Sequence, residues 1–246
     1  MGEWTTIAYP TGGGRVTSSR IRVPGWNTAT AAEGYRQVRE NIAILVTDHA
    51  GAGERAVPAC PQWTVRDLIA HLTEICDRVI TRFGGEACPI PESASAVELL
   101  KLWLERGPEA DNLLAADGGG KSRGDIMVMD AFTHELDIRY ALGAPPPQAH
   151  AAWLRGFEVL VGGLGASLGR HELPGMRIET EGATWIAGTE PVAAVLSGAP
   201  SDLYRTLAGR RSPAQIAAMD WLGDPEPWLR AFTWGPFTPP EAEIER

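Results

Sequence analysis

The stretch that decides the fold is residues 125–142, DIMVMDAFTHELDIRYAL. Asp130 and His134 stand four residues apart in it, so on a helix both side chains project from one side. That side also carries four apolar residues, which are Met127, Ala131, Ile138 and Ala141. The pattern predicts a helix that turns a carboxylate and an imidazole toward a core, although such a pair is also common on a solvated face.

A second predicted helix, residues 64–83, carries a third polar group on its apolar face. His71 lies there between Leu68 and Ile75. Alone, such a histidine is more typical of a satisfied core residue than of a metal ligand. The three groups together favour a divalent metal, because an unpaired buried carboxylate is costly and a cation would satisfy it. Two imidazoles and one carboxylate leave coordination positions open, as catalytic metal sites do.

Four helices are expected before a triple proline at residues 145–147. Their apolar spacing predicts helices at residues 30–49, 64–83, 96–115 and 125–142, with a break or kink at Gly107-Pro108 and a flexible turn at 117–120. Four helices of this length predict a bundle, which builds metal sites from side chains on facing helices. His49 is a further candidate ligand, although a histidine in the last turn of a helix also interacts with the helix dipole.

After the triple proline the pattern changes to mixed strands and helices. We expect a helix at residues 151–168, strands at 176–180, 184–187 and 192–196, and helices from Ser201 to Leu207 and from Ser212 to Trp221. The chain is therefore predicted to be mostly α with two domains, a four-helix bundle followed by a small α+β domain. The predicted boundaries are a loose extension at 1–27, the bundle at 28–145, the α+β domain at 149–236 and a tail at 237–246.

Composition narrows the classes of function. The chain has 246 residues and a net charge of −9 with no cluster of basic residues, which argues against nucleic acid and anionic membrane surfaces. It has no apolar run of about 18 residues and no secretion signal, so we expect a cytoplasmic protein without a membrane span. Its 3 cysteines, Cys60, Cys76 and Cys88, fit neither a disulfide framework nor a cysteine zinc site. A catalytic cysteine is possible, but no feature of the sequence supports it beyond the presence of the three cysteines.

Three motifs resemble one known family. Residues 60–72, CPQWTVRDLIAHL, resemble the second-helix signature of the mycothiol-dependent maleylpyruvate isomerase family. Residues 130–143, DAFTHELDIRYALG, resemble its fourth-helix signature, and residues 202–210, DLYRTLAGR, resemble the stretch that closes its C-terminal domain. The resemblance spans about residues 30–235 and implies a DinB-like bundle and an actinobacterial source.

The resemblance also implies site residues and cosubstrates. His71, Asp130 and His134 would bind a divalent metal, usually zinc, although the founding isomerase has glutamate where this chain has Asp130. Mycothiol would be the thiol cosubstrate. An arginine of the C-terminal domain would bind the substrate carboxylate, and the candidates are Arg205, Arg210 and Arg211. A solvated position at a helix end is the alternative for each of them.

The chemistry expected of such a site starts from a thiol held as thiolate by the metal. The chain would be an isomerase or a thiol S-transferase acting on a small electrophile, as a monomer or homodimer. Glu74, Glu135 or Asp137 could orient the imidazoles, although each is also typical of a solvated helix surface.

Other classes of function remain open from the sequence. The main alternative is a non-catalytic metal-binding or thiol-sensing bundle with a partner-binding C-terminal domain. Hydrolysis by a bound water has no clear general base here. A nonheme iron oxygenase uses the same ligand types but usually on a β-scaffold.

Overall fold

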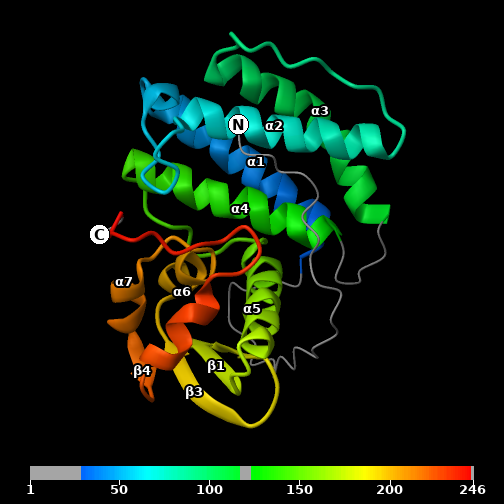
Figure 1. Ribbon diagram of the computed structural model, residues 1–246. Coiled ribbons are helices and arrows are strands. Elements are labelled where there is room, and N and C mark those ends of the chain that lie inside the picture. Colours follow the sequence, from blue (N-terminus) through cyan, green and yellow to red (C-terminus); the bar gives the residue numbers. More distant parts are fainter. Residues whose placement is uncertain (1–28, 117–122, 245–246) are drawn as a thin grey trace. The chain divides into compact units, whose positions relative to one another are not determined.

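The computed structural model describes residues 29–116 and 123–244. The chain is mostly helical with a small sheet in its C-terminal part (Figure 1), which confirms the predicted fold class. It divides into two compact units, one ending at Gly156 and the other beginning at Phe157, later in the chain than the triple proline. The extension predicted at 1–27 and the turn predicted at 117–120 lie outside the described residues.

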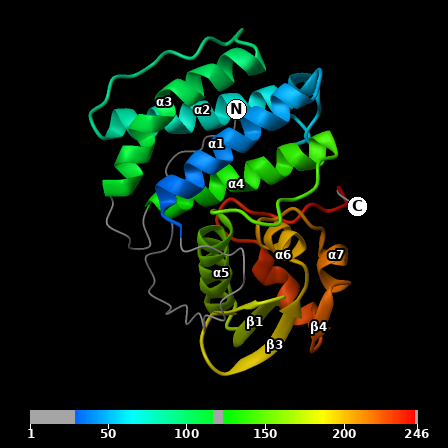
Figure 2. The ribbon, with the colours of Figure 1, turned by 180° about the vertical axis from the view of Figure 1, so that it is seen from behind.

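The first unit holds the four predicted helices. They are α1 (Ala31–Asp48), α2 (Val65–Arg82), α3 (Ala96–Ala116) and α4 (Arg123–Leu142), with a short 3₁₀ helix, η1 (Ala52–Glu54), after α1. Helix α1 packs against both α3 and α4, and α2 packs chiefly against α3 (Figure 2). The apolar spacing of the sequence thus located all four elements.

The start of α2 is fixed by a capping box. The Thr64 hydroxyl accepts a hydrogen bond from the Asp67 backbone N–H at 3.3 Å, and the Asp67 carboxylate accepts one from the Thr64 N–H at 2.9 Å. This reciprocal pair satisfies two backbone donors that a helix start leaves free. It sets the register of the helix that carries His71.

Helix α3 continues through Pro108 and changes direction along its length (Figure 1), so of the predicted break or kink the structure has the kink. Gly107 has a packing role, because a Cβ there would lie 2.2 Å from Nε of Arg39. The Arg39 guanidinium passes this point to make two hydrogen bonds, of 2.9 and 2.7 Å, with Asp111. This ion pair joins α1 to the end of α3 and holds the helix together past the proline.

The C-terminal unit is built on a four-stranded sheet of order β2-β1-β3-β4. Its elements are α5 (Trp153–Arg170, which begins in the first unit), β1 (Gly175–Thr180), β2 (Ala183–Ala187), β3 (Val192–Ser197), α6 (Pro200–Leu207), α7 (Pro213–Ala217), β4 (Asp220–Leu222) and a 3₁₀ helix, η2 (Glu226–Phe232). Strands β1 and β3 are parallel, and the other two pairings are antiparallel. The three predicted strands are all present.

Two predictions for this unit were wrong in detail. Ser201 lies inside α6, whose N-cap is Ala199, because Pro200 takes the first helical position. The last helix ends at Ala217 and not near Trp221. Trp221 belongs instead to β4, opposite Leu196. Its indole N–H donates to the Ile216 carbonyl at 2.8 Å, which ties the strand to the end of the helix it leaves.

Aromatic packing fills the core of the C-terminal unit. Phe157 stacks on Trp185, with ring centroids 4.6 Å apart, and meets Tyr204 edge-on at 5.3 Å. Gly163 in α5 gives room to Trp234, whose ring a Cβ there would approach to 2.0 Å. The glycines that weaken α5 as an isolated helix therefore allow close packing within its unit.

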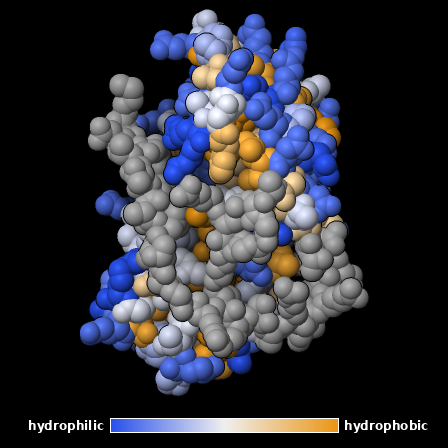
Figure 3. All heavy atoms as spheres, turned by 90° about the vertical axis from the view of Figure 1, so that its right-hand side faces the viewer, coloured by the Kyte–Doolittle hydropathy of each residue, from blue (hydrophilic) through white to orange (hydrophobic). Residues whose placement is uncertain are grey.

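Figure 3 shows one face of the molecule, on which the coloured residues are mostly hydrophilic and are interspersed with smaller hydrophobic patches. Across residues 29–116 and 123–244, every helix is too short or too polar to cross a lipid bilayer.

Candidate metal centre

The three residues singled out from the sequence come together in the bundle. Asp130 on α4 turns one carboxylate oxygen toward Nε2 of His71 on α2, at 3.7 Å, and the other toward Nε2 of His134, also at 3.7 Å. One potential ligand atom from each residue lies within 4.8 Å of the other two. The two imidazole rings meet edge to face, with centroids 5.3 Å apart.

The spacing of these atoms suits a cation better than direct contact. A separation of 3.7 Å is too long for a hydrogen bond between nitrogen and oxygen. Two ligands held about 2.1 Å from a tetrahedral zinc ion lie roughly 3.4 Å apart. The side chain of Asp130 is 35% exposed, against 15% for His71 and 10% for His134. The carboxylate side of the trio is therefore open to small ligands, and the histidine side is enclosed.

Asp137 orients His134 from behind. Its carboxylate Oδ2 lies 3.0 Å from Nδ1 of His134, and its side chain is fully buried. A carboxylate only accepts, so Nδ1 carries the proton and Nε2 presents its lone pair toward Asp130. Metal-binding histidines are commonly held in this way by a carboxylate on the far nitrogen. For Asp137 the solvated-surface alternative is therefore wrong, and its spacing of three residues from His134 is the signal that pointed to it.

Glu74 and Glu135, the other two orienting candidates, contact neither histidine of the trio in this manner. Glu74 is exposed on α2, as its solvated alternative predicted. Glu135 is fully buried, so the solvated alternative is wrong for it, yet it turns to other partners. Its Oε1 accepts from Arg139 at 2.7 Å and from Asn41 at 3.1 Å.

His150 completes this second group, which we call the Glu135 cluster (Glu135, Arg139, Asn41 and His150). Nδ1 of His150 accepts from the Ala152 N–H at 3.0 Å, so the proton of the neutral ring is on Nε2. Nε2 faces Oε2 of Glu135 at 3.1 Å, although the angle is poor for a hydrogen bond. The ring also stacks on Phe132, with centroids 4.4 Å apart. Sequence reasoning did not connect His150 with Glu135.

A loop before α2 brings two further residues to the trio. Backbone hydrogen bonds from Val57 N–H to the Trp63 carbonyl (3.0 Å) and from Trp63 N–H to the Cys60 carbonyl (2.8 Å) close this loop. The Trp63 ring centroid then lies 5.3 Å from that of His71 and 6.5 Å from that of His134. Sequence reasoning assigned neither Trp63 nor Cys60 a role, although both belong to the motif at residues 60–72.

The remaining histidine and cysteine candidates lie apart from the trio. His49 forms the C-cap of α1, and its Nδ1 is 2.8 Å from the Leu45 carbonyl, as expected for a helix-end histidine. All 3 cysteines lie outside any disulfide bond. Cys76 is buried, and burial raises the pKa of its thiol, which makes it a poor nucleophile at neutral pH.

The three candidate arginines belong to the C-terminal unit. Arg205 is buried on α6, so it is not a solvated helix-end residue. Arg210 donates to the Ala208 carbonyl at 2.7 Å and lies over the ring of Phe237, 5.8 Å from its centroid. Arg211 pairs with Asp202 at 3.0 Å. Substrate binding by any of them stays a prediction.

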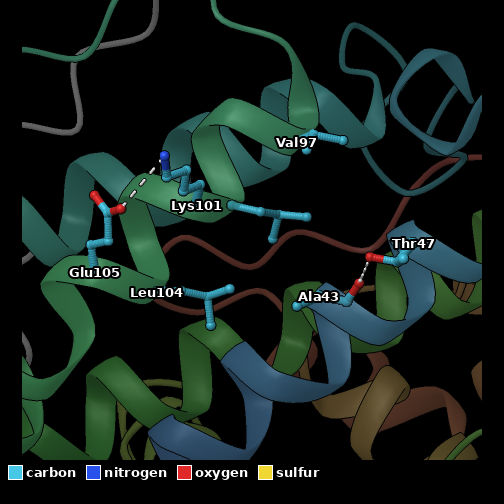
Figure 4. A pocket seen from close by; sticks show the side chains of 7 residues that line it. Ala43, Thr47, Val97, Lys101, Leu104 and Glu105 are labelled. Atoms are coloured by element: carbon cyan, nitrogen blue, oxygen red, sulfur yellow. Dashed lines mark hydrogen bonds and ion pairs between the residues drawn. The ribbon is translucent and has the colours of Figure 1, made fainter.

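An open hollow on the outside of the bundle offers no comparable chemistry. It lies between α1 and α3 and encloses about 370 Å³ (Figure 4). Its lining is mostly aliphatic, with one exposed ion pair of 3.9 Å between Lys101 and Glu105. It contains no histidine, cysteine or buried carboxylate, so it is a weaker candidate than the trio.

Comparisons with known proteins give few matches. No family model and no curated protein matches the chain. Among solved structures, a mycothiol-dependent maleylpyruvate isomerase is similar at 14% identity, over 73% of this chain and 88% of that chain, with a TM-score of 0.46. A histidine-to-alanine mutant of a mycothiol-dependent maleylpyruvate isomerase gives 11% identity and a TM-score of 0.45 over the same shares. At these values neither similarity decides an activity or a substrate.

Proposed function

We propose that this chain is a metal- and thiol-dependent enzyme, an isomerase or a thiol S-transferase that acts on a small electrophile. We assign His71, Asp130 and His134 as ligands of one divalent cation, with zinc as the first choice. The observation that carries the proposal is the 3.7 Å spacing of both Nε2 atoms from the Asp130 oxygens. Asp137, 3.0 Å behind His134, supports the assignment.

The charge of this donor set favours an anionic cosubstrate. Two neutral imidazoles and one carboxylate leave a divalent ion with a net charge of about +1, so a further anionic ligand is attracted. When bound, such an ion favours the deprotonated form of a thiol. Burial raises the pKa of the Cys76 thiol and makes it a poor nucleophile, so we propose an external thiol as the nucleophile. Mycothiol is proposed because the motifs at residues 60–72, 130–143 and 202–210 resemble a mycothiol-dependent family.

The residues around the trio have defined tasks in this proposal. Asp137 holds the Nδ1 proton of His134 and keeps the ring in one orientation. Trp63 lies beside both imidazoles and limits the access of water from that side. The exposed side of Asp130 leaves a path for the thiol and the electrophile. A buried arginine such as Arg205, or Arg210, is proposed to bind a substrate carboxylate.

The reaction itself takes place on the thiol and the substrate. The thiolate adds to one carbon of a cis-enedioyl double bond, and the displaced electron pair moves onto the neighbouring carbonyl as an enolate. The former carbon–carbon double bond is now single and rotates. Collapse of the enolate then re-forms the double bond, expels the thiolate and leaves the trans isomer. In the transferase version the enolate takes a proton at carbon, and the thioether is the product.

A thiol titration of the metal-loaded protein tests the proposal. We expect calorimetry to show mycothiol binding to the wild type, and at least ~100-fold weaker binding to His71→Ala because the trio then lacks one of its three ligands. Glu74→Ala is the matched control, since Glu74 is exposed one turn away on the same helix. A panel of cis-enedioyl compounds and other electrophiles, with and without thiol, then separates isomerisation from transfer. Absence of both thiol binding and thiol-dependent turnover would contradict the proposal and favour the non-catalytic alternative.

A further inference from the structure

Cys60 lies beside the trio without belonging to it. Potential ligand atoms of Cys60, His134 and Asp137 all lie within 4.8 Å of one another, which makes a second group of metal-ligating type in the bundle. Cys60 is half-buried, and the hydrogen-bonded loop at residues 57–63 fixes its backbone. Its thiol is thus held next to a histidine and a fully buried carboxylate.

The two groups share His134, and each has its carboxylate near a different nitrogen of the imidazole ring. Asp130 lies 3.7 Å from Nε2, whereas Asp137 lies 3.0 Å from Nδ1. A neutral imidazole has one N–H and one free lone pair, so it can serve only one cation at a time. The shared ring therefore makes the two groups competitors for a metal ion.

We propose that Cys60, His134 and Asp137 form a second binding set, which takes a thiophilic divalent cation such as Zn²⁺, Co²⁺ or Cd²⁺ in competition with the first set. The competition, but not the second set, rests on the function proposed above. Sulfur is a soft ligand that selects such ions, and a cysteine, a histidine and a carboxylate are all established zinc ligands.

Occupation of the second set requires a defined exchange of protons. The Cys60 thiol loses its proton to solvent as its sulfur becomes a ligand. The proton of His134 leaves Nδ1 and a proton is taken up at Nε2, so Nδ1 can bind the ion and Nε2 can no longer serve the first set. Asp137 exchanges its hydrogen bond with Nδ1 for a bond to the ion. One thiolate and one carboxylate cancel the charge of a divalent ion.

The two positions consequently differ in function. The first set leaves a net charge of about +1 and attracts an external thiolate, whereas the second is neutral and already contains a thiolate. An ion in the second set would be in a resting position that does not activate the cosubstrate. Excess external thiol favours the first position, and thiol depletion favours the second.

Cobalt absorption separates the two sets. The His71→Ala variant lacks one ligand of the first set and keeps the second intact. We expect it to bind one Co²⁺ per chain with a sulfur-to-cobalt charge-transfer band in the near ultraviolet. Adding Cys60→Ser should abolish the band and weaken Co²⁺ binding at least ~10-fold. Adding Cys88→Ser should change neither, because Cys88 is a half-buried thiol outside both groups.

Alkylation of the thiols gives a second readout on the same variants. Cd²⁺ should slow the reaction of Cys60 with iodoacetamide in His71→Ala, while Cys88 in the same chain reacts unchanged. Absence of the charge-transfer band from His71→Ala, or its persistence after Cys60→Ser, overturns the second set. The Cys60→Ser single variant keeps all three ligands of the first set. This variant can therefore still bind metal and thiol through the first set even if the second set does not exist, which distinguishes the two proposals.

Discussion

Two polar groups include neighbouring residues of α4, His134 in the trio and Glu135 in the Glu135 cluster, and their polar atoms are arranged differently. In the Glu135 cluster, Oε1 of the carboxylate accepts from Arg139 at 2.7 Å and Asn41 at 3.1 Å, and Oε2 faces Nε2 of His150 at 3.1 Å inside the core. In the trio, the Asp130 oxygens stand 3.7 Å from both imidazoles, and one side is open. Burial of charged groups on one helix therefore does not identify a functional site. Separation of the donor atoms and access from solvent make the distinction.

Replacement of one histidine from each group should have the largest effects, on metal content in the trio and on stability in the Glu135 cluster. We expect His134→Ala to lose the bound metal, because one of three ligands is removed. His150→Ala should keep one metal per chain and lose about 3 kcal/mol of unfolding free energy, since it removes a buried partner of Glu135 and a ring stacked on Phe132. Elemental analysis and urea unfolding measure the two effects.

The two histidine variants also serve as controls for each other. Equal metal content in wild type and His134→Ala would remove His134 from the ligand set. Metal loss from a folded His150→Ala protein would show that the Glu135 cluster is coupled to the trio and is not a separate structural group.

Replacement of Asp137 or of Glu135 should have smaller effects, and only the first should lower metal affinity. Asp137→Ala removes the acceptor of the His134 Nδ1 proton, so we expect metal affinity to fall about 10–100-fold. Glu135→Gln keeps the shape of the side chain and should leave metal affinity unchanged while lowering stability by about 1–3 kcal/mol. Competition with a chromophoric chelator gives the affinities. An equal loss of affinity in both variants contradicts the separation of the two groups.

Weakening the capping box of α2 should have the smallest effect on stability and should leave the trio and the Glu135 cluster intact. Burial raises the pKa of Asp67, but hydrogen bonds from Thr64 and the neighbouring Arg66 outweigh it and hold the pKa below the usual value for an aspartate side chain. Because the folded pKa is lowered, this stabilisation is present above about pH 4 and is lost as pH falls through the folded pKa. We expect Asp67→Asn to cost about 1 kcal/mol at neutral pH and less in acid, with unchanged metal content.

Unfolding curves between neutral and acid pH measure this difference. A constant difference between wild type and Asp67→Asn down to strong acid would mean that the charge of Asp67 does not contribute to the cap.

The helices, and the side of its helix on which each residue of the trio lies, were predictable because local spacing determines them. Asp130 and His134 share a helix side whatever surrounds them, and the apolar residues beside His71 predicted the side that α2 turns inward. The predicted start of that helix at residue 64 lies within one residue of its observed start at Val65. Sequence spacing is sufficient where one element decides the outcome.

Features that depend on several elements were predicted less well. Sequence reasoning left Glu135 and Asp137 open as either orienting groups or surface charges, yet every residue of α4 from 131 to 138 is buried, which only the packing of the whole chain determines. The nearness of Cys60 and Trp63 to the histidines depends on closure of a loop. Trp221 looked like the end of a helix, but pairing with β3 placed it in a strand. In each case a partner distant in sequence decided the conformation.

The close approach of Gly107 to Arg39 has an evolutionary consequence. Any side chain at residue 107 would occupy the space of the guanidinium, so Gly107 can be replaced only if Arg39 shortens or turns away. The two positions should consequently covary among relatives, with Asp111 losing its acidic character whenever Arg39 is lost. A glycine followed by a proline, which reads as the end of a helix, would then be retained inside α3 by selection on a side chain of another helix.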